Sequence, residues 1–167
     1  MDDILLSRRS IRKFKPDAVS AEDLDYILRA AMAAPSAGNE QPWHFIVLDD
    51  KNVLNAIPKF HPHADVLNNT SIAICICADP SLEKYEGRWV LDCAAATENA
   101  LIAANVKGLG SVWLGIYPDN GRIENTGRLL NTPMGIVPFS IVAIGHADEM
   151  KKPSERYKPE RIHKNIW

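Results

Sequence analysis

The residues best suited to chemistry form a basic cluster near the start of the chain. Five of the eight residues from 8 to 15 are Arg or Lys, in a protein with a net charge of −2. Such a cluster predicts a bound anion, because arginine can bind phosphate through two parallel hydrogen bonds and Ser10 adds a hydroxyl donor. A solvated basic stretch or a nucleic-acid-binding arm is the alternative interpretation. The apolar residues Ile11 and Phe14, between the charges, favour a segment docked on the core.

Small polar residues gather in a second segment, A-P-S-A-G-N-E-Q-P-W, at positions 34–43. Ser36, Asn39 and Gln41 offer hydrogen-bonding groups beside Trp43, and loops on rigid scaffolds often carry binding groups. The prolines and the glycine explain a rigid turn by themselves. Taken alone, this segment is therefore more typical of a turn than of a site.

A glycine-rich segment, G-L-G-S-V-W-L-G-I-Y-P, occupies positions 108–118. It is not the dinucleotide-binding fingerprint, which requires G-x-G-x-x-G between a strand and a following helix; here position 113 is Trp and the expected order is helix to strand. Gly115 has no side chain, so a flat ligand could lie against the backbone and receive a hydrogen bond from an exposed N–H group. A simple β-bulge explains this glycine equally well.

Metal-binding and acid–base residues are sparse. His61 and His63, with Asp65 nearby, could chelate a divalent ion, but the proline between them and the lack of a further ligand cluster favour a surface loop. Cys75 and Cys77 form one C-x-C without a second pair, which is weak evidence for zinc. The sequence contains no G-x-S-x-G, H-E-x-x-H or P-loop motif. An enzyme with this sequence would therefore depend on a cofactor for its reactive group.

The composition of the whole chain describes one soluble globular domain. The chain has 167 residues, of which 46% are hydrophobic and 24% are charged. Its longest apolar run, 72–78, is far shorter than the roughly 18 residues that span a bilayer, so we expect no membrane segment. An acidic start and three cysteines in apolar surroundings predict a cytoplasmic protein with buried, unpaired thiols. Residues 151–167 are polar, basic and rich in proline, and we interpret them as the C-terminal arm of a single domain, 1–167.

The spacing of apolar residues predicts the elements that position these groups. Ser20 begins a variant capping box, and apolar residues at 24, 27, 28, 31 and 32 predict a helix that ends before Pro35. The alanine-rich stretch 88–106 predicts a central buried helix, and 122–130 predicts a short one. Apolar runs predict strands at 43–48, 72–78, 111–116 and 136–145, with Pro138 at an edge or a bulge. Because helices and strands do not alternate regularly, we expect an α+β fold with a mostly antiparallel sheet.

Taken together and in this order, the segments resemble the nitroreductase family of flavin-dependent oxidoreductases. The resemblance rests on R-R-S-I-R-K-F at 8–14, A-P-S-A-G-N-E-Q-P-W-H-F at 34–45, D-x-x-x-A-x-E-N at 92–99 and G-L-G-S-V-W-L-G at 108–115. It covers most of the chain and implies a short, single-domain member of the family. The fold it implies has a central, mostly antiparallel sheet packed by helices, in an intertwined homodimer whose C-terminal arms pack on the partner subunits.

The resemblance also implies a function. Family members bind FMN at the subunit interface, take hydride from NADH or NADPH at flavin N5, and pass electrons to an electron-poor small molecule, such as a nitro compound or a quinone, in a ping-pong cycle. We expect no side chain of this protein to act as a catalytic acid or base, and neither nucleic acid nor membrane as a partner. The alternative is a protein that holds or senses flavin with little turnover.

The family's contacts with the polar end of FMN map onto the basic residues. The resemblance implies that Arg8, Arg9 and Ser10 hold the phosphate and ribityl end. Arg12 would reach the pyrimidine edge of the flavin, where its charge would favour the reduced state. Arg156, in the C-terminal arm, would be a second phosphate ligand.

The contacts with the flavin ring come from the two other segments. The resemblance implies that Leu114 and Gly115 pass close to the isoalloxazine, with a backbone N–H of Gly115 or Ile116 toward N5. The partner subunit would cover the flavin with its small-residue loop and place one amide near the pyrimidine side. The loop residues concerned are Pro35, Ser36, Ala37 and Asn39, together with Gln41 for the amide.

Overall fold

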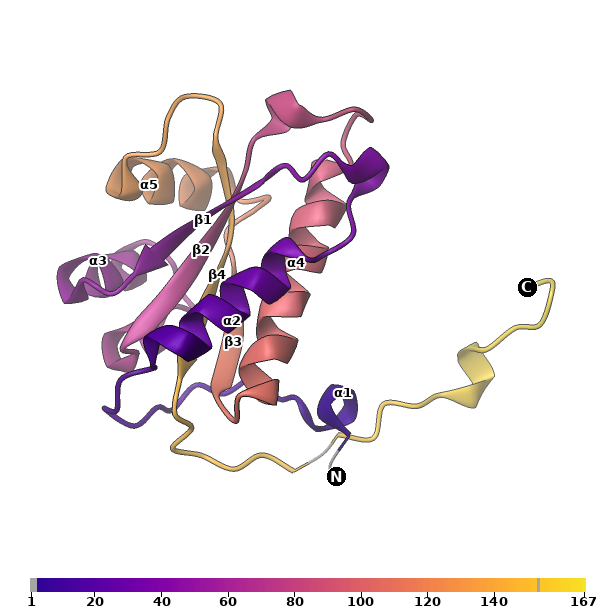
Figure 1. The fold of residues 1–167 in the computed structure, drawn as a ribbon, viewed down its shortest axis with the longest axis horizontal. Helices are drawn as coiled ribbons and strands as arrows, with labels where there is room; N and C mark the ends of the chain where they lie inside the picture. Colours follow the sequence, from indigo (N-terminus) through magenta and orange to yellow (C-terminus); the bar gives the residue numbers. More distant parts are fainter. Residues whose placement is uncertain (1–2, 153) are drawn as a thin grey trace.

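Four antiparallel strands form the centre of the molecule (Figure 1). The computed structural model describes residues 3–152 and 154–167. The strands lie in the order β1-β2-β4-β3, and every neighbouring pair is antiparallel. The predicted α+β fold is confirmed, and each predicted strand lies within one residue of its expected bounds. The strands are β1 (Trp43–Leu48), β2 (Ile72–Ala78), β3 (Gly110–Gly115) and β4 (Val137–Gly145).

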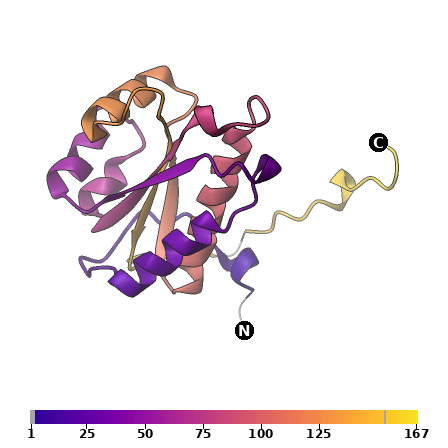
Figure 2. The ribbon, with the colours of Figure 1, turned by 45° about the horizontal axis from the view of Figure 1, so that its top comes forward.

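Helices cover both faces of the sheet (Figures 1 and 2). One face packs against α2 (Ala21–Met32) and α4 (Trp89–Val106). The other packs against α3 (Lys51–Ala56) and α5 (Asn120–Leu130), together with the turns between α3 and β2. Short helical segments complete the chain: α1 (Ile4–Ser7), η1 (Ala37–Asn39), η2 (Ile57–Lys59), η3 (Asp65–Asn69), η4 (Pro80–Leu82) and η5 (Pro159–Arg161).

Strand β2 is buried on both faces, which explains its unbroken apolar sequence. Ile74 and Ile76 contribute to the core shared with α2 and α4. Cys75 and Cys77 contribute to the core on the opposite face. Both thiols, and that of Cys93, are buried and unpaired, as the sequence predicts.

The two long helices begin and pack as their sequences predict. The Ser20 hydroxyl accepts a hydrogen bond from the Asp23 backbone N–H at 3.0 Å, which caps the start of α2. The Asp23 carboxylate reaches back to the Ser20 hydroxyl, which donates to it at 2.8 Å. Helix α4 packs against both α2 and the sheet. Its small residues Ala96, Ala100 and Ala104 are fully buried, so this helix lies in the core.

Pro138 lies at a bulge in an interior strand. Ser140 of β4 faces Ile76, but Pro138 faces the next residue, Cys77, so Phe139 is the extra residue on β4. The prediction of an edge or a bulge is therefore confirmed as a bulge, because β4 lies between β2 and β3 and is not an edge strand. The irregularity allows proline inside a sheet, since a bulge interrupts the regular ladder of hydrogen bonds.

The basic segment is docked on the sheet, as its apolar residues predict. Ser10 forms a parallel bridge with Ser111, and the Ile11 backbone N–H donates to the Ser111 carbonyl at 2.9 Å. Ile11 and Phe14 are each only 8% exposed. Their side chains lie over glycines at the ends of β3 and β4, where an added Cβ would come within 3.0 Å of them. The segment is therefore fixed in place by the core.

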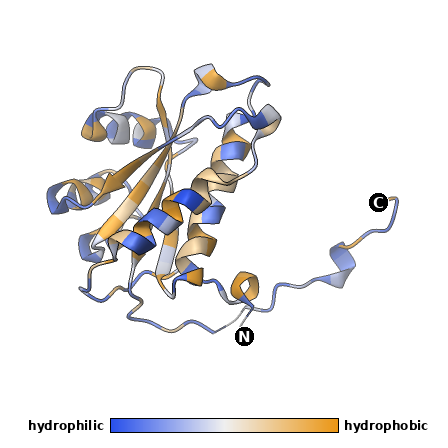
Figure 3. Cartoon of the chain, in the orientation of Figure 1, coloured by the Kyte–Doolittle hydropathy of each residue, from blue (hydrophilic) through white to orange (hydrophobic). Residues whose placement is uncertain are grey.

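The C-terminal arm extends away from the body of the molecule (Figures 1 and 2). Figure 3 shows hydrophobic residues concentrated on the strands and mostly hydrophilic ones along the arm. The arm nevertheless carries large exposed apolar side chains at Tyr157, Ile162, Ile166 and Trp167. Within the described residues, no helix is both long and apolar enough to cross a membrane.

Candidate functional site

Arg8 and Arg9 line a hollow of about 190 Å³ beside the start of β3. Lys151 adds a third cation. Arg8 Nε lies 3.2 Å from Glu98 Oε1, in the middle of α4. Arg9 donates to carbonyl oxygens of Leu6, Arg8 and Lys152 at 2.9, 2.6 and 3.1 Å. Ser7, Ile11, Asn105, Gly108, Leu109, Gly110, Ser111 and Ala147 also line this hollow.

Arg156 meets the same two arginines in a second hollow, of about 630 Å³. This space lies between the N-terminal segment and the start of the arm, and Arg156 Nε donates to the Ser154 hydroxyl at 3.3 Å. The Ser10 carbonyl accepts a hydrogen bond from Lys151 Nζ at 2.6 Å. The structure thus brings Arg156 to the side of the molecule where the sequence predicts phosphate binding.

Arg12 lies at a different hollow, of about 380 Å³. Its side chain is exposed, and its backbone N–H donates to the Glu149 carboxylate. That hydrogen bond is the main reason why the pKa of Glu149 lies below its ordinary value. Glu149 therefore helps to hold the basic segment on the body. His63, Asp65, Val66 and Asn69 line the hollow with Arg12.

The small-residue loop forms the short turn η1. Ser36 Oγ accepts a hydrogen bond from the Gln41 N–H at 3.1 Å, and Gln41 Nε2 donates to Asn39 Oδ1 at 3.0 Å. These polar groups satisfy one another, as expected for turn chemistry. The loop is also strained, because Asn39 and Gln41 have φ values of 54° and 48°. A left-handed non-glycine residue costs roughly 1–2 kcal/mol, so the surroundings must hold this loop in place.

The end of β3 directs the backbone N–H of Gly115 away from β4. The Ile116 N–H donates to the Phe139 carbonyl at 3.1 Å, which places Ile116 in a hydrogen-bonded pair with β4. In an antiparallel ladder such pairs alternate, so the backbone groups of Gly115 point away from β4. An added Cβ at Gly115 would meet no atom within 4 Å. The resemblance offers two N–H groups for N5, and among the described residues only that of Ile116 has a backbone partner on β4. The Leu114 side chain is buried.

Two donors fix the Gly115 carbonyl: His61 Nε2 lies 2.9 Å from it, and Arg122 Nη1 lies 3.0 Å from it. His61 Nδ1 accepts the His63 backbone N–H at 3.2 Å, which assigns the ring proton to Nε2. Burial, with the charge of Arg122, lowers the pKa of His61 below its ordinary value.

The prediction that His61 lies in a surface loop is thus wrong, because its side chain is buried, with 1% of the residue exposed. The sequence carries no signal for this role, because the hydrogen bond spans 54 positions. The described part of the chain contains no group of three metal-binding residues.

The predicted site residues fall into groups that one chain does not bring together. The loop contacts Asp92, whose carboxylate accepts the Ala37 N–H at 3.0 Å, whereas Arg8 contacts Glu98. These contacts are six residues apart on α4, or about 9 Å along its axis. The two hollows that Arg8 and Arg9 line include no residue of the loop.

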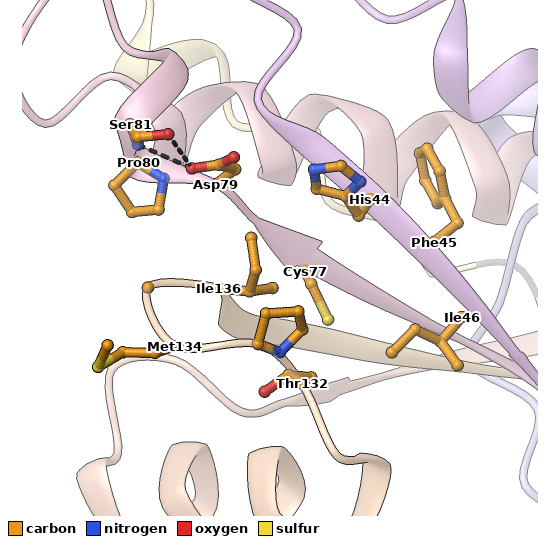
Figure 4. Close-up of a pocket in the computed structure, with 12 residues that line it drawn as sticks. His44, Phe45, Ile46, Cys77, Asp79, Pro80, Ser81, Thr132, Met134 and Ile136 are labelled. Carbon is orange, nitrogen blue, oxygen red and sulfur yellow. Dashed lines mark hydrogen bonds between the residues drawn. The ribbon is translucent and has the colours of Figure 1, made fainter.

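A further hollow, of about 770 Å³, contains none of the predicted site residues (Figure 4). It lies beside the open edge of β1, opposite the turn before β4, and it is mainly apolar. The Asp79 carboxylate at its rim accepts hydrogen bonds from the Ser81 N–H at 2.9 Å and the Ser81 hydroxyl at 2.6 Å. Its lining residues are His44, Phe45, Ile46, Cys77, Asp79, Pro80, Ser81, Thr132, Pro133, Met134, Gly135 and Ile136.

Comparison with known proteins places these features in a family. The sequence model of the Nitroreductase family matches residues 5–69, which include the basic segment and the small-residue loop. A relative in Archaeoglobus fulgidus, named "Putative NADH dehydrogenase/NAD(P)H nitroreductase", is 47% identical over 98% of this chain and 97% of its own.

Solved structures agree over nearly the whole length. An "FMN-dependent Nitroreductase" from Clostridium difficile R20291 is 31% identical, with a TM-score of 0.93 over 100% of both chains. A structure from Desulfovibrio desulfuricans, described as "a putative nitroreductase in complex with fmn", is 27% identical, with a TM-score of 0.84 over 98% of this chain and 95% of that one. Shared sequence along almost all of its length, together with a shared fold, shows that this chain belongs to the nitroreductase family.

Proposed function

We propose that this protein is an FMN-dependent oxidoreductase that takes electrons from NADH or NADPH and delivers them to an electron-poor small molecule, such as a nitro compound or a quinone. When bound, FMN supplies the hydride-accepting group that the side chains lack, in a ping-pong cycle with donor and acceptor. The observation that carries the proposal is the docked pair Arg8 and Arg9 beside a hollow. Relatives named for FMN and NAD(P)H support it.

The basic residues suit the phosphate end of FMN. Within the described residues, neither Arg9 nor Arg12 has a carboxylate within 4.0 Å. Arginines without an acidic partner can donate to a phosphate, which accepts several charge-assisted hydrogen bonds. Arg9 and Ser10 would therefore hold the phosphate and ribityl end together with Arg8, whose guanidinium also pairs with Glu98. Arg156 would be a second phosphate ligand.

The remaining residues suit the ring end. The N–H of Gly115 would donate to the flavin ring, and the open space beside this glycine would let a flat group approach the backbone. His61 and Arg122 position this part of the chain through the Gly115 carbonyl. Arg12 would place a positive charge at the pyrimidine edge, where it stabilises the anionic reduced ring. Gln41 would add an amide there.

A homodimer would complete the site. The loop Pro35–Gln41 lies apart from Arg8 and Arg9 in one chain, which supports the proposal that the loop covers a flavin held by the partner subunit. The chain also leaves uncovered an apolar hollow beside β1 and the apolar side chains of the arm. Two uncovered apolar surfaces on one chain are expected where a second copy binds. We therefore propose that the arm, 151–167, packs on the partner subunit.

The decisive experiment is an anaerobic titration followed by visible absorption. Protein stripped of flavin should take up FMN in a saturable way, and adding NADH or NADPH should bleach the flavin band until an acceptor restores it. Arg9→Ala should weaken FMN binding about tenfold or more, because one charge-assisted contact is lost. The matched control is Arg29→Ala, whose guanidinium pairs with Asp25 on the surface of α2.

Two outcomes would contradict the proposal. If the protein takes up no FMN, the proposed function is wrong. Protein that binds FMN but reacts only slowly with both nicotinamides, and with no acceptor, would instead be a protein that holds or senses flavin.

A further inference from the structure

Two buried carboxyl groups belong to Glu40, within the small-residue loop, and to Asp92, which accepts a hydrogen bond from the start of that loop. Glu40 is 7% exposed and Asp92 is 5% exposed. Asp92 accepts the Ala37 N–H, three residues before Glu40, and each carboxyl shifts the pKa of the other. Among the described residues, no donor reaches Glu40 Oε1 or Asp92 Oδ2, although both oxygens are buried. Buried acceptors without a donor are rare in folded proteins, so this pair requires an explanation.

The other oxygen of each carboxyl holds a different piece of backbone. Asp92 Oδ1 accepts the Ala37 N–H at 3.0 Å, at the start of the loop turn. Glu40 Oε2 accepts the Lys84 N–H at 2.8 Å, in the segment that follows η4. The two carboxyl groups together therefore connect the loop, the 83–88 segment and the first turn of α4. One proton between Oδ2 and Oε1 would satisfy both unpartnered oxygens and remove the repulsion between two buried negative charges.

We infer that Glu40 and Asp92 share one proton, and that this protonated pair is the positioning device that holds the Pro35–Gln41 loop in the shape required to cover the flavin. The inference rests on the proposed function for the role of the loop, but the shared proton itself does not. Both residues are positioning residues, because neither is placed in contact with the cofactor.

The charged groups around the pair favour one proton on Asp92. Burial, followed by the neighbouring Glu40 and Glu83, raises the pKa of Asp92 above its ordinary value, although the Ala37 N–H opposes this. The Lys84 backbone N–H lowers the pKa of Glu40. On α4, burial raises the pKa of Cys93 to about 12, so this thiol stays neutral. Lys84 Nζ donates to the Gly38 carbonyl at 2.7 Å and provides a second attachment for the loop.

The sign of the pH effect follows from the raised pKa of Asp92. Below the raised value the proton is present and the pair holds the loop. As the pH rises through that value, the proton leaves and two adjacent carboxylates repel each other. Loop order and FMN affinity should therefore fall as the pH rises.

The test compares the natural protein with Asp92→Asn. An asparagine at this position can accept the Ala37 N–H with its oxygen and donate to Glu40 with its amide, so it copies the protonated carboxyl without titrating. At the acidic end of the range its FMN dissociation constant should lie within about twofold of that of the natural protein. Toward alkaline pH, affinity should fall about tenfold or more in the natural protein relative to Asp92→Asn. Titration of the FMN phosphate affects both proteins equally and cancels in this ratio.

Two measurements need no bound flavin. In the flavin-free protein, carbon NMR of the Asp92 carboxyl should show a single titration well above that of an ordinary aspartate. In the natural protein, amide hydrogen exchange at residues 37–41 should accelerate with rising pH more steeply than exchange from an unprotected amide. In Asp92→Asn this extra acceleration should be absent. Asp92→Ala should lose protection at every pH, and Glu22→Gln, which neutralises an exposed carboxylate on α2, should behave like the natural protein.

The outcomes separate this inference from the proposed function. If the protein binds no FMN at any pH, the proposed function is wrong. The NMR titration would still test whether Glu40 and Asp92 share a proton. Parallel pH profiles for FMN binding in the natural protein and in Asp92→Asn would overturn the positioning role. An Asp92 carboxyl that titrates as an ordinary aspartate would overturn the shared proton.

Discussion

A methyl group added at Gly110 should displace the basic segment from the sheet. A Cβ built at Gly110 would lie 2.8 Å from Ile11 Cγ2, 2.9 Å from Ile11 Cβ and 3.1 Å from Ile11 Cγ1. Carbon atoms pack at about 3.5–4.0 Å, so the two residues must separate by roughly 0.5–1 Å. Rotation of the side chain gives no relief, because one of the clashing atoms is Ile11 Cβ. The backbone around Ile11 must therefore move.

The magnitude follows from what that movement disturbs. Overpacking of a core costs about 1–3 kcal/mol. Stretching the hydrogen bond from the Ile11 N–H to the Ser111 carbonyl costs about 1 kcal/mol more. Gly110→Ala should therefore reduce the free energy of unfolding by about 2–4 kcal/mol. Because Arg8 and Arg9 precede Ile11 by only two or three positions, FMN affinity should fall as well.

The assay is urea denaturation combined with an FMN titration under conditions where the variant remains folded. Gly121→Ala is the matched control, since its Cβ would meet only Asp119 Oδ1 at 3.4 Å and alanine favours a helix by about 1 kcal/mol. The double variant Gly110→Ala, Ile11→Ala should lose less stability than the sum of the two single variants, since the clash is shared. A free energy of unfolding for Gly110→Ala within about 0.5 kcal/mol of the natural protein would refute the packing argument. Normal FMN affinity in a destabilised protein would show that docking of the segment does not position the arginines.

Three further predictions test other parts of the site. Gly115→Ala should have a free energy of unfolding within about 0.5 kcal/mol of that of the natural protein, because an added Cβ would meet no atom within 4 Å. It should nevertheless bind FMN more weakly in a fluorescence titration. Equal FMN affinity would show that the flavin does not lie against Gly115. The lowered pKa of His61 means that the unfolded chain takes up a proton below pH about 6.5 while the folded chain does not. Stability should therefore be lost as the pH falls below that value, and this loss should be smaller in His61→Gln; identical pH profiles in chemical denaturation would exclude the effect. A chain ending at residue 150 should remain folded but elute as a monomer in size-exclusion chromatography with light scattering, whereas a dimer would show that the arm is dispensable for association.

Local sequence patterns predict the helices and strands, and they predict an anion at the basic segment. Local patterns are sufficient there: an 18-residue helix without a polar face is recognisable as central, and alternating or continuous apolar runs define strands to within one residue. The docking of Ile11 and Phe14 was also predictable, because apolar residues between charges need a core to bury them. The basic cluster predicts an anion from residue types alone.

Contacts between residues far apart in the sequence are seen only in the folded chain. The hydrogen bonds of His61 with Gly115 and of Ala37 with Asp92 join residues 54 and 55 positions apart, and no local pattern specifies such contacts. Pro138 illustrates the same limit: its chemistry excludes a regular interior ladder, but only the strand order shows that a bulge, and not an edge, accommodates it. Side-chain type thus fixes what a residue can bind, whereas the path of the chain through the core fixes what it faces.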